Sequence, residues 1–196
     1  MSAVTRGATG PGMAGRMREL APGLLAGFLL PAVVYWLVRP HAGGDAAALA
    51  IGGAVPAAWT VLRLAVWRRV DPVALAGTAA FAGAAVVSVL TGGSSLPLKL
   101  HDAVVTGALG LACVVSIAIR RPLLGLLGRR LGTPHALAAG TAIAGVTLIV
   151  HAAAHTLVAL TLPTSSYVIV SRVVGLPIYA AGALVLIRSL RRQAAA

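Results

Sequence analysis

The sequence predicts an all-α fold: a polytopic membrane helix bundle with six transmembrane helices and both termini cytoplasmic. Hydrophobic residues make up 59% of the 196-residue chain, charged residues only 10%, and the mean hydropathy is +0.94. A soluble domain carries about a quarter charged residues, so this composition excludes that class. A span needs about 20 apolar residues, and six spans therefore use most of the chain. We expect one membrane domain and no separate soluble domain.

Six apolar runs separated by short polar segments are the expected spans: Leu20–Val38, Ala46–Val66, Pro72–Leu90, Ala103–Ile119, Ala136–Leu162 and Tyr167–Ile187. The first run is longer than the apolar core of a signal peptide, which has roughly 7–15 residues, so we expect a span rather than a leader. The expected organisation is a disordered basic tail at 1–18, a six-span membrane domain at 19–190 and a short cytoplasmic tail at 191–196.

Helix-start signals stand before each run. The four acidic residues of the chain lie at the N-terminal edges of the first four runs: Glu19, Asp45, Asp71 and Asp102. A carboxylate at that position can cap free backbone N–H groups and meets the positive end of the helix. The fifth run follows Thr133-Pro134, and the sixth follows a segment of Pro, Thr and Ser. If all four acids are caps, no carboxylate lies in mid-membrane, which argues against a pump built on an acidic relay.

Basic residues crowd into every second gap between the runs. Of the 16 Lys and Arg residues, only Arg39 and Lys99 fall in the opposite gaps, and Arg172 lies inside the sixth run. Cytoplasmic loops of membrane proteins retain Lys and Arg, so this pattern places both termini inside a bacterial cytoplasmic membrane. The net charge of +12 then reflects topology and attraction to anionic lipid headgroups, and we expect no nucleic-acid partner.

Three ionisable residues within the last two runs form a candidate site. His151 and His155 are four residues apart and share one helical face, and Arg172 lies about five residues into the sixth run. An Arg inside a span usually faces a bundle interior or an aqueous cavity. We therefore hypothesise a polar pocket between spans five and six that opens outward. In the alternative interpretation, Arg172 extends towards the interface and the histidines hydrogen-bond across helices.

The sequence gives little support for a metal, a cofactor or catalysis. Two imidazoles alone are too few ligands, and Ala152 follows His151 where a H-E-x-x-H motif would have Glu. Residues four apart on one helix cannot hold haem from opposite sides, and Cys113 is the only cysteine. Gly92-Gly93-Ser94-Ser95 does not match the G-x-S-G motif of intramembrane serine proteases. We expect no metal, no cofactor and no enzymatic activity.

Small residues spaced four apart favour close helix packing. They are the pairs Ala103 with Gly107 and Gly140 with Ala144. Such pairs serve either packing within the chain or a homodimer interface, and contact with another membrane protein stays open as well.

One stretch, from Trp67 to Pro122, carries a resemblance. Its features are Asp71-Pro72, the run Ser88 to Gly92, Leu96-Pro97-Leu98-Lys99, the run Thr106 to Gly110, and Arg120-Arg121-Pro122-Leu123. This stretch resembles small bacterial multi-pass membrane proteins of unassigned function that are related to intracellular septation protein A. The resemblance implies a protein of the bacterial cytoplasmic membrane. It also implies an acidic and a basic residue in the fifth span, where this chain has His151 and His155.

The loop before the fourth run holds the most distinctive polar residues of that stretch. Lys99 and Asp102 are three apart and could pair at the start of the span. The candidate ligand-binding residues are therefore His151, His155, Arg172, Lys99 and Asp102. Two classes of function remain open: a small-solute permease or binding protein with an outward polar pocket, and a non-catalytic envelope or septation accessory protein that acts through membrane helix contacts.

Overall fold

The structure is a computed structural model, and it describes residues 30–68, 72–127 and 133–194. The described part is all-helical, as expected. Its helices are α2 (Leu30–Val38), α3 (Asp45–Trp67), α4 (Pro72–Leu90), α5 (Leu96–Ala118), α6 (Leu123–Leu127), α7 (Pro134–Thr161) and α8 (Thr164–Ala194). The expected N-terminal tail, Glu19 and Asp71 lie outside the described residues.

Four of the described helices are long and apolar enough to cross a membrane: Asp45–Val66, Leu96–Ala118, Pro134–Thr161 and Thr164–Arg192. A fifth apolar helix, Ala74–Leu90, is shorter. Large apolar side chains cover the outer surfaces of these helices, among them Val104, Leu111 and Leu157, each more than 60% exposed. An apolar outer surface of this extent is typical of helices that face lipid.

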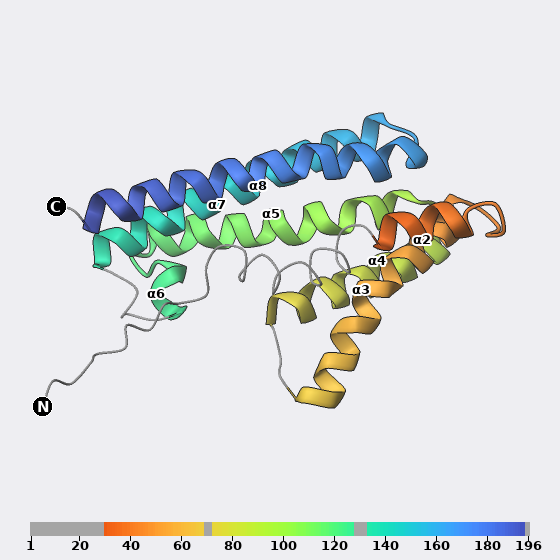
Figure 1. The fold of residues 1–196 in the computed structure, drawn as a ribbon, viewed down its shortest axis with the longest axis horizontal. Helices are drawn as coiled ribbons and strands as arrows, with labels where there is room; N and C mark the ends of the chain where they lie inside the picture. Colours follow the sequence, from red (N-terminus) through yellow and green to blue (C-terminus); the bar gives the residue numbers. More distant parts are fainter. Residues whose placement is uncertain (1–29, 69–71, 128–132, 195–196) are drawn as a thin grey trace, which may run out of the picture.

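The three long helices α5, α7 and α8 lie side by side, and α3 runs obliquely away from them (Figure 1). Glycines allow α5 and α7 to approach closely. A Cβ atom added to Gly145 of α7 would lie 2.8 Å from the Cβ of Cys113 on α5, and one added to Gly110 of α5 would lie 3.1 Å from the Gly145 carbonyl oxygen. The closest contact between these two helices therefore depends on residues without a Cβ.

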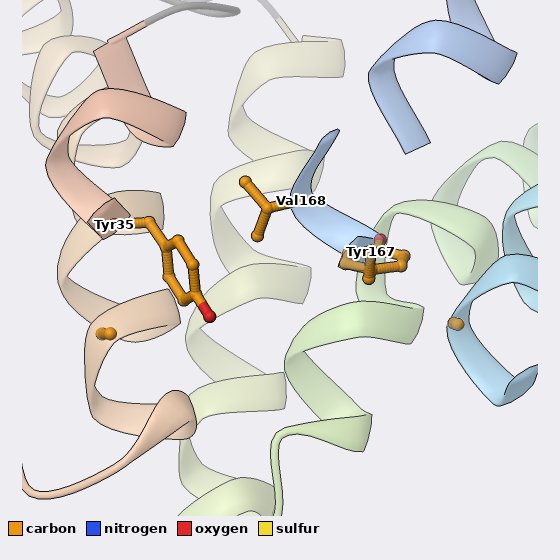
Figure 2. Packing of buried hydrophobic residues seen from close by; sticks show 5 residues of the cluster. Tyr35, Tyr167 and Val168 are labelled. Atoms are coloured by element: carbon orange, nitrogen blue, oxygen red, sulfur yellow. The ribbon is translucent and has the colours of Figure 1, made fainter. Parts of the chain in front are cut away.

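The loops α2–α3, α4–α5 and α7–α8 gather at one end of the bundle (Figure 1). A small apolar cluster next to them joins α2, α3, α7 and α8, and Figure 2 shows part of its packing. Its buried members are Tyr35, Ala48, Ala159, Tyr167 and Val168. The α4–α5 turn passes through Gly92 and Gly93, whose φ angles of 72° and 84° favour glycine.

Helix starts agree with the sequence in one case and differ in another. Thr133 caps α7 as expected, because its hydroxyl oxygen accepts the backbone N–H of Ala136 at 3.2 Å. The expected start of the fourth span at Ala103 is wrong, because α5 already begins at Leu96. Pro97 is tolerated there because the first turn of a helix does not need its N–H.

The early start of α5 changes the position of Asp102. This residue lies six positions inside the helix, so the interpretation of Asp102 as a cap is wrong. Its carboxylate belongs to a helix long and apolar enough to cross a membrane. The expectation that all four acids are helix caps therefore fails at this residue.

Candidate ligand-binding site

A cavity of about 470 Å³ lies where α5, α7 and α8 meet α2, α3 and α4. Four of the five candidate residues line it: Asp102, His151, His155 and Arg172. The hypothesis of a pocket between the last two spans therefore names too few helices, because α5 also lines the cavity and supplies the carboxylate. Asp102 lies six residues after the start of α5 and His155 six residues before the end of α7. At 1.5 Å per residue, both are about 9 Å from the same end of the bundle.

The two histidines lie against each other on one face of α7, as their spacing predicts. Their ring centroids are 4.0 Å apart with an angle of 31° between the planes. Tyr179 of α8 continues the stack, with its ring centroid 4.4 Å from that of His151. The exposed fractions of His151 and His155 are only 2% and 6%. Imidazoles buried to this degree need polar partners.

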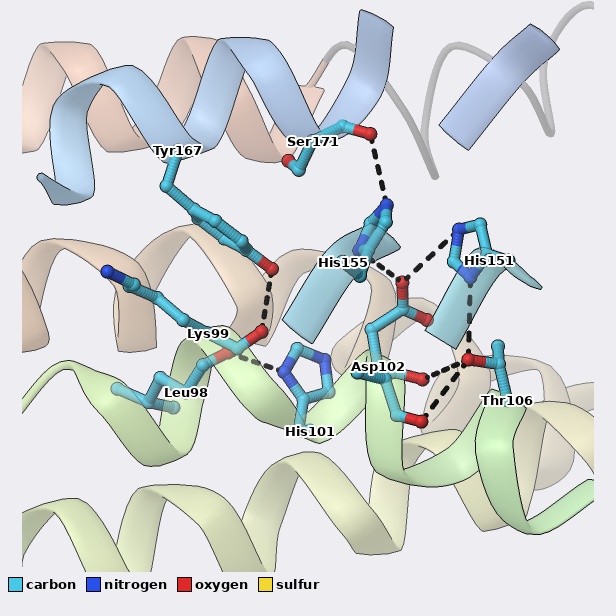
Figure 3. Close-up of polar contacts among 10 residues, drawn as sticks. Leu98, Lys99, His101, Asp102, Thr106, His151, His155, Tyr167 and Ser171 are labelled. Carbon is cyan, nitrogen blue, oxygen red and sulfur yellow. Dashed lines mark hydrogen bonds and ion pairs between the residues drawn. The ribbon is translucent and has the colours of Figure 1, made fainter. Parts of the chain in front are cut away.

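The carboxylate of Asp102 faces both rings (Figure 3). One of its oxygens lies 3.3 Å from Nδ1 of His155 and 4.0 Å from Nε2 of His151. The side chain of Asp102 is 44% exposed, on the side of the cavity. The cluster therefore combines two buried rings with one accessible carboxylate.

Each histidine has a second polar partner on a neighbouring helix. Nε2 of His155 lies 3.0 Å from the backbone oxygen of Ser171 on α8, and Nδ1 of His151 lies 3.4 Å from the hydroxyl oxygen of Thr106 on α5. Gly175 of α8 gives the rings their space, since a Cβ added there would lie 3.1 Å from Nε2 of both histidines. The three helices together thus fix the position of both rings.

Arg172 belongs to the same site by position and charge. It lines the cavity on α8, and its guanidinium is near enough to Asp102 for an attractive electrostatic interaction. An Arg within a membrane span is stable when it faces such a cavity or a counter-charge. Its position agrees with the hypothesis that it faces a pocket.

Lys99 lies apart from the cluster of Asp102, His151 and His155. The pairing of Lys99 with Asp102 that the sequence suggested is not formed, because Lys99 has another partner. Its Nζ donates to the backbone oxygen of Leu162 at 2.8 Å and lies 5.5 Å from the centroid of the Tyr167 ring. Tyr167 in turn donates its hydroxyl to the backbone oxygen of Lys99 at 2.7 Å. Lys99 therefore ties the start of α5 to the α7–α8 loop.

Sequence reasoning missed the contributions of Thr106, Ser171, Gly175 and Tyr179. Thr106 is four residues after Asp102 and shares its helical face, which is a signal that the sequence offered. The other three lie on the face of α8 that also carries Arg172. Their pairing with residues of α7 becomes visible only in three dimensions.

No protein-family model, no curated protein and no solved structure matches this chain. The fold and site define its class directly. The described part of the chain is all-helical, with four helices suited to a membrane and a polar cluster on a cavity among them.

Proposed function

We propose that this chain is a six-span protein of the bacterial cytoplasmic membrane with both termini cytoplasmic. In this proposal the six crossings are the four long apolar helices, the shorter α4 and the first apolar run. The described part of that first run is α2. Arg120 and Arg121 follow α5, and Arg191 and Arg192 lie in the last turns of α8. At the opposite end, the loops and the first turn of α5 hold Arg39 and Lys99 as their only Lys or Arg residues. The positive-inside rule supports this orientation, with anionic headgroups around the basic end.

We propose further that the protein binds a small polar solute in the cavity and serves as a binding protein or permease. The observation that carries this proposal is the cluster of Asp102, His151 and His155 on the cavity wall. Ionisable groups inside a membrane domain are costly and usually mark a ligand or ion path. The site lies nearer the end with few basic residues, so we assign the opening of the cavity to the outer side.

Binding is favoured over nucleophilic catalysis by the way His155 meets Ser171. Asp102, His155 and Ser171 have the residue types of a hydrolase triad. In such a triad the imidazole takes a proton from the serine hydroxyl. Here Nε2 of His155 meets the backbone oxygen of Ser171, which has no proton to give. We therefore propose a non-enzymatic role.

Cysteine accessibility tests the proposed cavity with a matched pair on α5. Val105 lines the cavity, whereas its neighbour Val104 is 64% exposed on the outer face. In a Cys113→Ala background, Val105→Cys is expected to react with a membrane-impermeant, water-soluble thiol reagent added from outside. Val104→Cys is expected to stay unlabelled, because lipid excludes water from that face.

Each of the other outcomes has a defined meaning. If neither cysteine reacts, the water-filled cavity does not exist, and the accessory role through helix contacts or a homodimer takes its place. If both react equally, this part of α5 does not lie in lipid, and the membrane placement is wrong.

A further inference from the structure

The tautomer of His155 follows from its partner on α8. The backbone oxygen of Ser171 can only accept a hydrogen bond, so Nε2 of His155, 3.0 Å away, must carry the hydrogen. In a neutral ring Nδ1 then has a lone pair and no hydrogen. That atom is buried and has no hydrogen-bond partner. It lies 3.3 Å from an oxygen of Asp102, which is also an acceptor.

The tautomer of His151 follows from Thr106 by the same logic. The Thr106 hydroxyl donates to the backbone oxygen of Asp102 at 2.8 Å, so its oxygen is left to accept from Nδ1 of His151. Nε2 of His151 is then the bare nitrogen, and it lies 4.0 Å from the same Asp102 oxygen. Both rings thus turn a lone pair towards the carboxylate.

Three hydrogen-bond acceptors therefore face one another: Nδ1 of His155, Nε2 of His151 and one oxygen of Asp102. The three atoms lie within 4.8 Å of one another. Lone pairs in this arrangement repel one another unless a hydrogen-bond donor or a cation lies between them. The second ring nitrogen of each histidine donates to a protein oxygen, which is the usual support of a histidine that binds a metal.

We infer that Asp102, His151 and His155 bind a divalent transition-metal ion such as Zn²⁺. Two imidazoles with one carboxylate are a common donor set for Zn²⁺ with an open position. Magnesium and calcium prefer all-oxygen sites. Bonds of about 2.0–2.1 Å imply ligand atoms roughly 3.3 Å apart in a tetrahedron. The pair of His155 and Asp102 already has this spacing at 3.3 Å. His151 needs to approach Asp102, now 4.0 Å away, by about 0.7 Å and His155, within 4.8 Å, by at most about 1.5 Å.

The open position of the ion would face the cavity, because Asp102 is reached from there. Arg172 lies on the same cavity and adds positive charge, which weakens retention of a cation. A site that binds an ion and also releases it suits a solute path. The metal site depends on the proposed function in one respect, since it requires the cavity to be a binding site.

Titration with Co²⁺ tests the metal site, because Co²⁺ can substitute for Zn²⁺ and absorbs visible light when bound to few ligands. The full-length protein in mild detergent, with any affinity tag removed, is expected to bind one equivalent, and Zn²⁺ is expected to displace it. Asp102→Asn and His155→Gln keep the side-chain size but lose a ligand, and their affinity is expected to fall by at least about 100-fold. Asp45→Asn and His135→Gln are the matched controls, since neither residue lines the cavity.

A threonine pair tests the support of His151 without touching a ligand. Thr106→Val removes the acceptor for Nδ1 of His151, and the affinity for Co²⁺ is expected to fall by about 10–100-fold. Thr147→Val is its control, because Thr147 lies one turn before His151 and, among the described residues, its hydroxyl bonds to the backbone oxygen of Ile143 at 2.8 Å. If Asp102→Asn does not fold, Thr106→Val and His155→Gln provide the same test.

Two results would overturn the metal site: no saturable binding of Co²⁺ or Zn²⁺ by the folded protein, or binding that the Asp102→Asn and His155→Gln changes leave unaltered. The labelling of Val105→Cys separates this failure from failure of the proposed function. Labelling without metal binding removes the ion and leaves a pocket for another polar solute. Absence of both removes the pocket as well.

Discussion

The helices α5, α7 and α8 differ from α2, α3 and α4 in how they are held. In the most apolar stretches of α5 and α7, 28% of the residues are buried within the protein, against 6% in α3. The first group shares buried polar contacts between helices, such as those of His151, His155 and Lys99. The second group contributes mostly apolar wall to the cavity. The difference indicates that one half fixes the ligand groups while the other closes the space around them.

The largest effect is expected from a substitution at the close contact between α5 and α7, in the tightly packed half of the protein. In Gly145→Leu, the new side chain would meet the Cβ of Cys113 at the contact with α5. Overpacking of this kind is expected to cost about 3 kcal/mol or more, so the protein should lose its sharp thermal transition in detergent. Gly83→Leu in α4 is the counterpart, because nothing lies within 4 Å of its added Cβ. An equal loss of melting temperature in both variants would contradict the difference between the halves.

The next effect compares two polar ties at the same end of the bundle. Lys99→Met removes a charged donor and leaves the Leu162 oxygen without it, at an expected cost of about 2 kcal/mol. Arg39→Gln weakens the half-exposed pair between Arg39 in the α2–α3 loop and Asp45 at the start of α3, whose atoms are 2.8 Å apart. Exposed pairs contribute little, so no resolvable change is expected. Thermal unfolding of both variants checks the order, and a larger loss in Arg39→Gln would reverse it.

A smaller effect concerns binding rather than stability. Gly175→Ala places a Cβ 3.1 Å from Nε2 of both histidines and must displace the rings slightly. The affinity for Co²⁺ is expected to fall about 10-fold, as for other losses of ligand support, while the fold persists. Gly83→Ala serves as the control in the other half. Unchanged affinity in Gly175→Ala would mean that α8 does not fix the rings.

The sequence predicts the class of this fold better than its site. Long apolar runs predict helices because backbone groups in lipid must be hydrogen-bonded within the protein, and a helix does so within one segment. Arginine placement predicts the orientation. The same patterns single out His151, His155 and Arg172, since ionisable residues are rare in such runs. The sequence also names Asp102 as a candidate, but its predicted role as a cap is wrong, because the helix begins at Leu96, before Pro97.

The partners of the histidines could not be read from the sequence. Thr106 and His151 are 45 residues apart, and their contact depends on the glycines that bring α5 and α7 together. Ser171 acts through its backbone oxygen, which any residue could supply. Side-chain type therefore carries no signal for that contact.

Nitrogen NMR of the histidine rings tests the central claim most directly. The protein contains five histidines, and His151→Gln and His155→Gln assign the two signals in ¹⁵N-histidine-labelled protein in detergent. At neutral pH without added metal, His151 is expected to carry its hydrogen on Nδ1 and His155 on Nε2. Addition of Zn²⁺ is expected to shift the signals of the two bare nitrogens most. A hydrogen on Nδ1 of His155, shared with Asp102, would contradict the account, because the three acceptors would then already hold a proton.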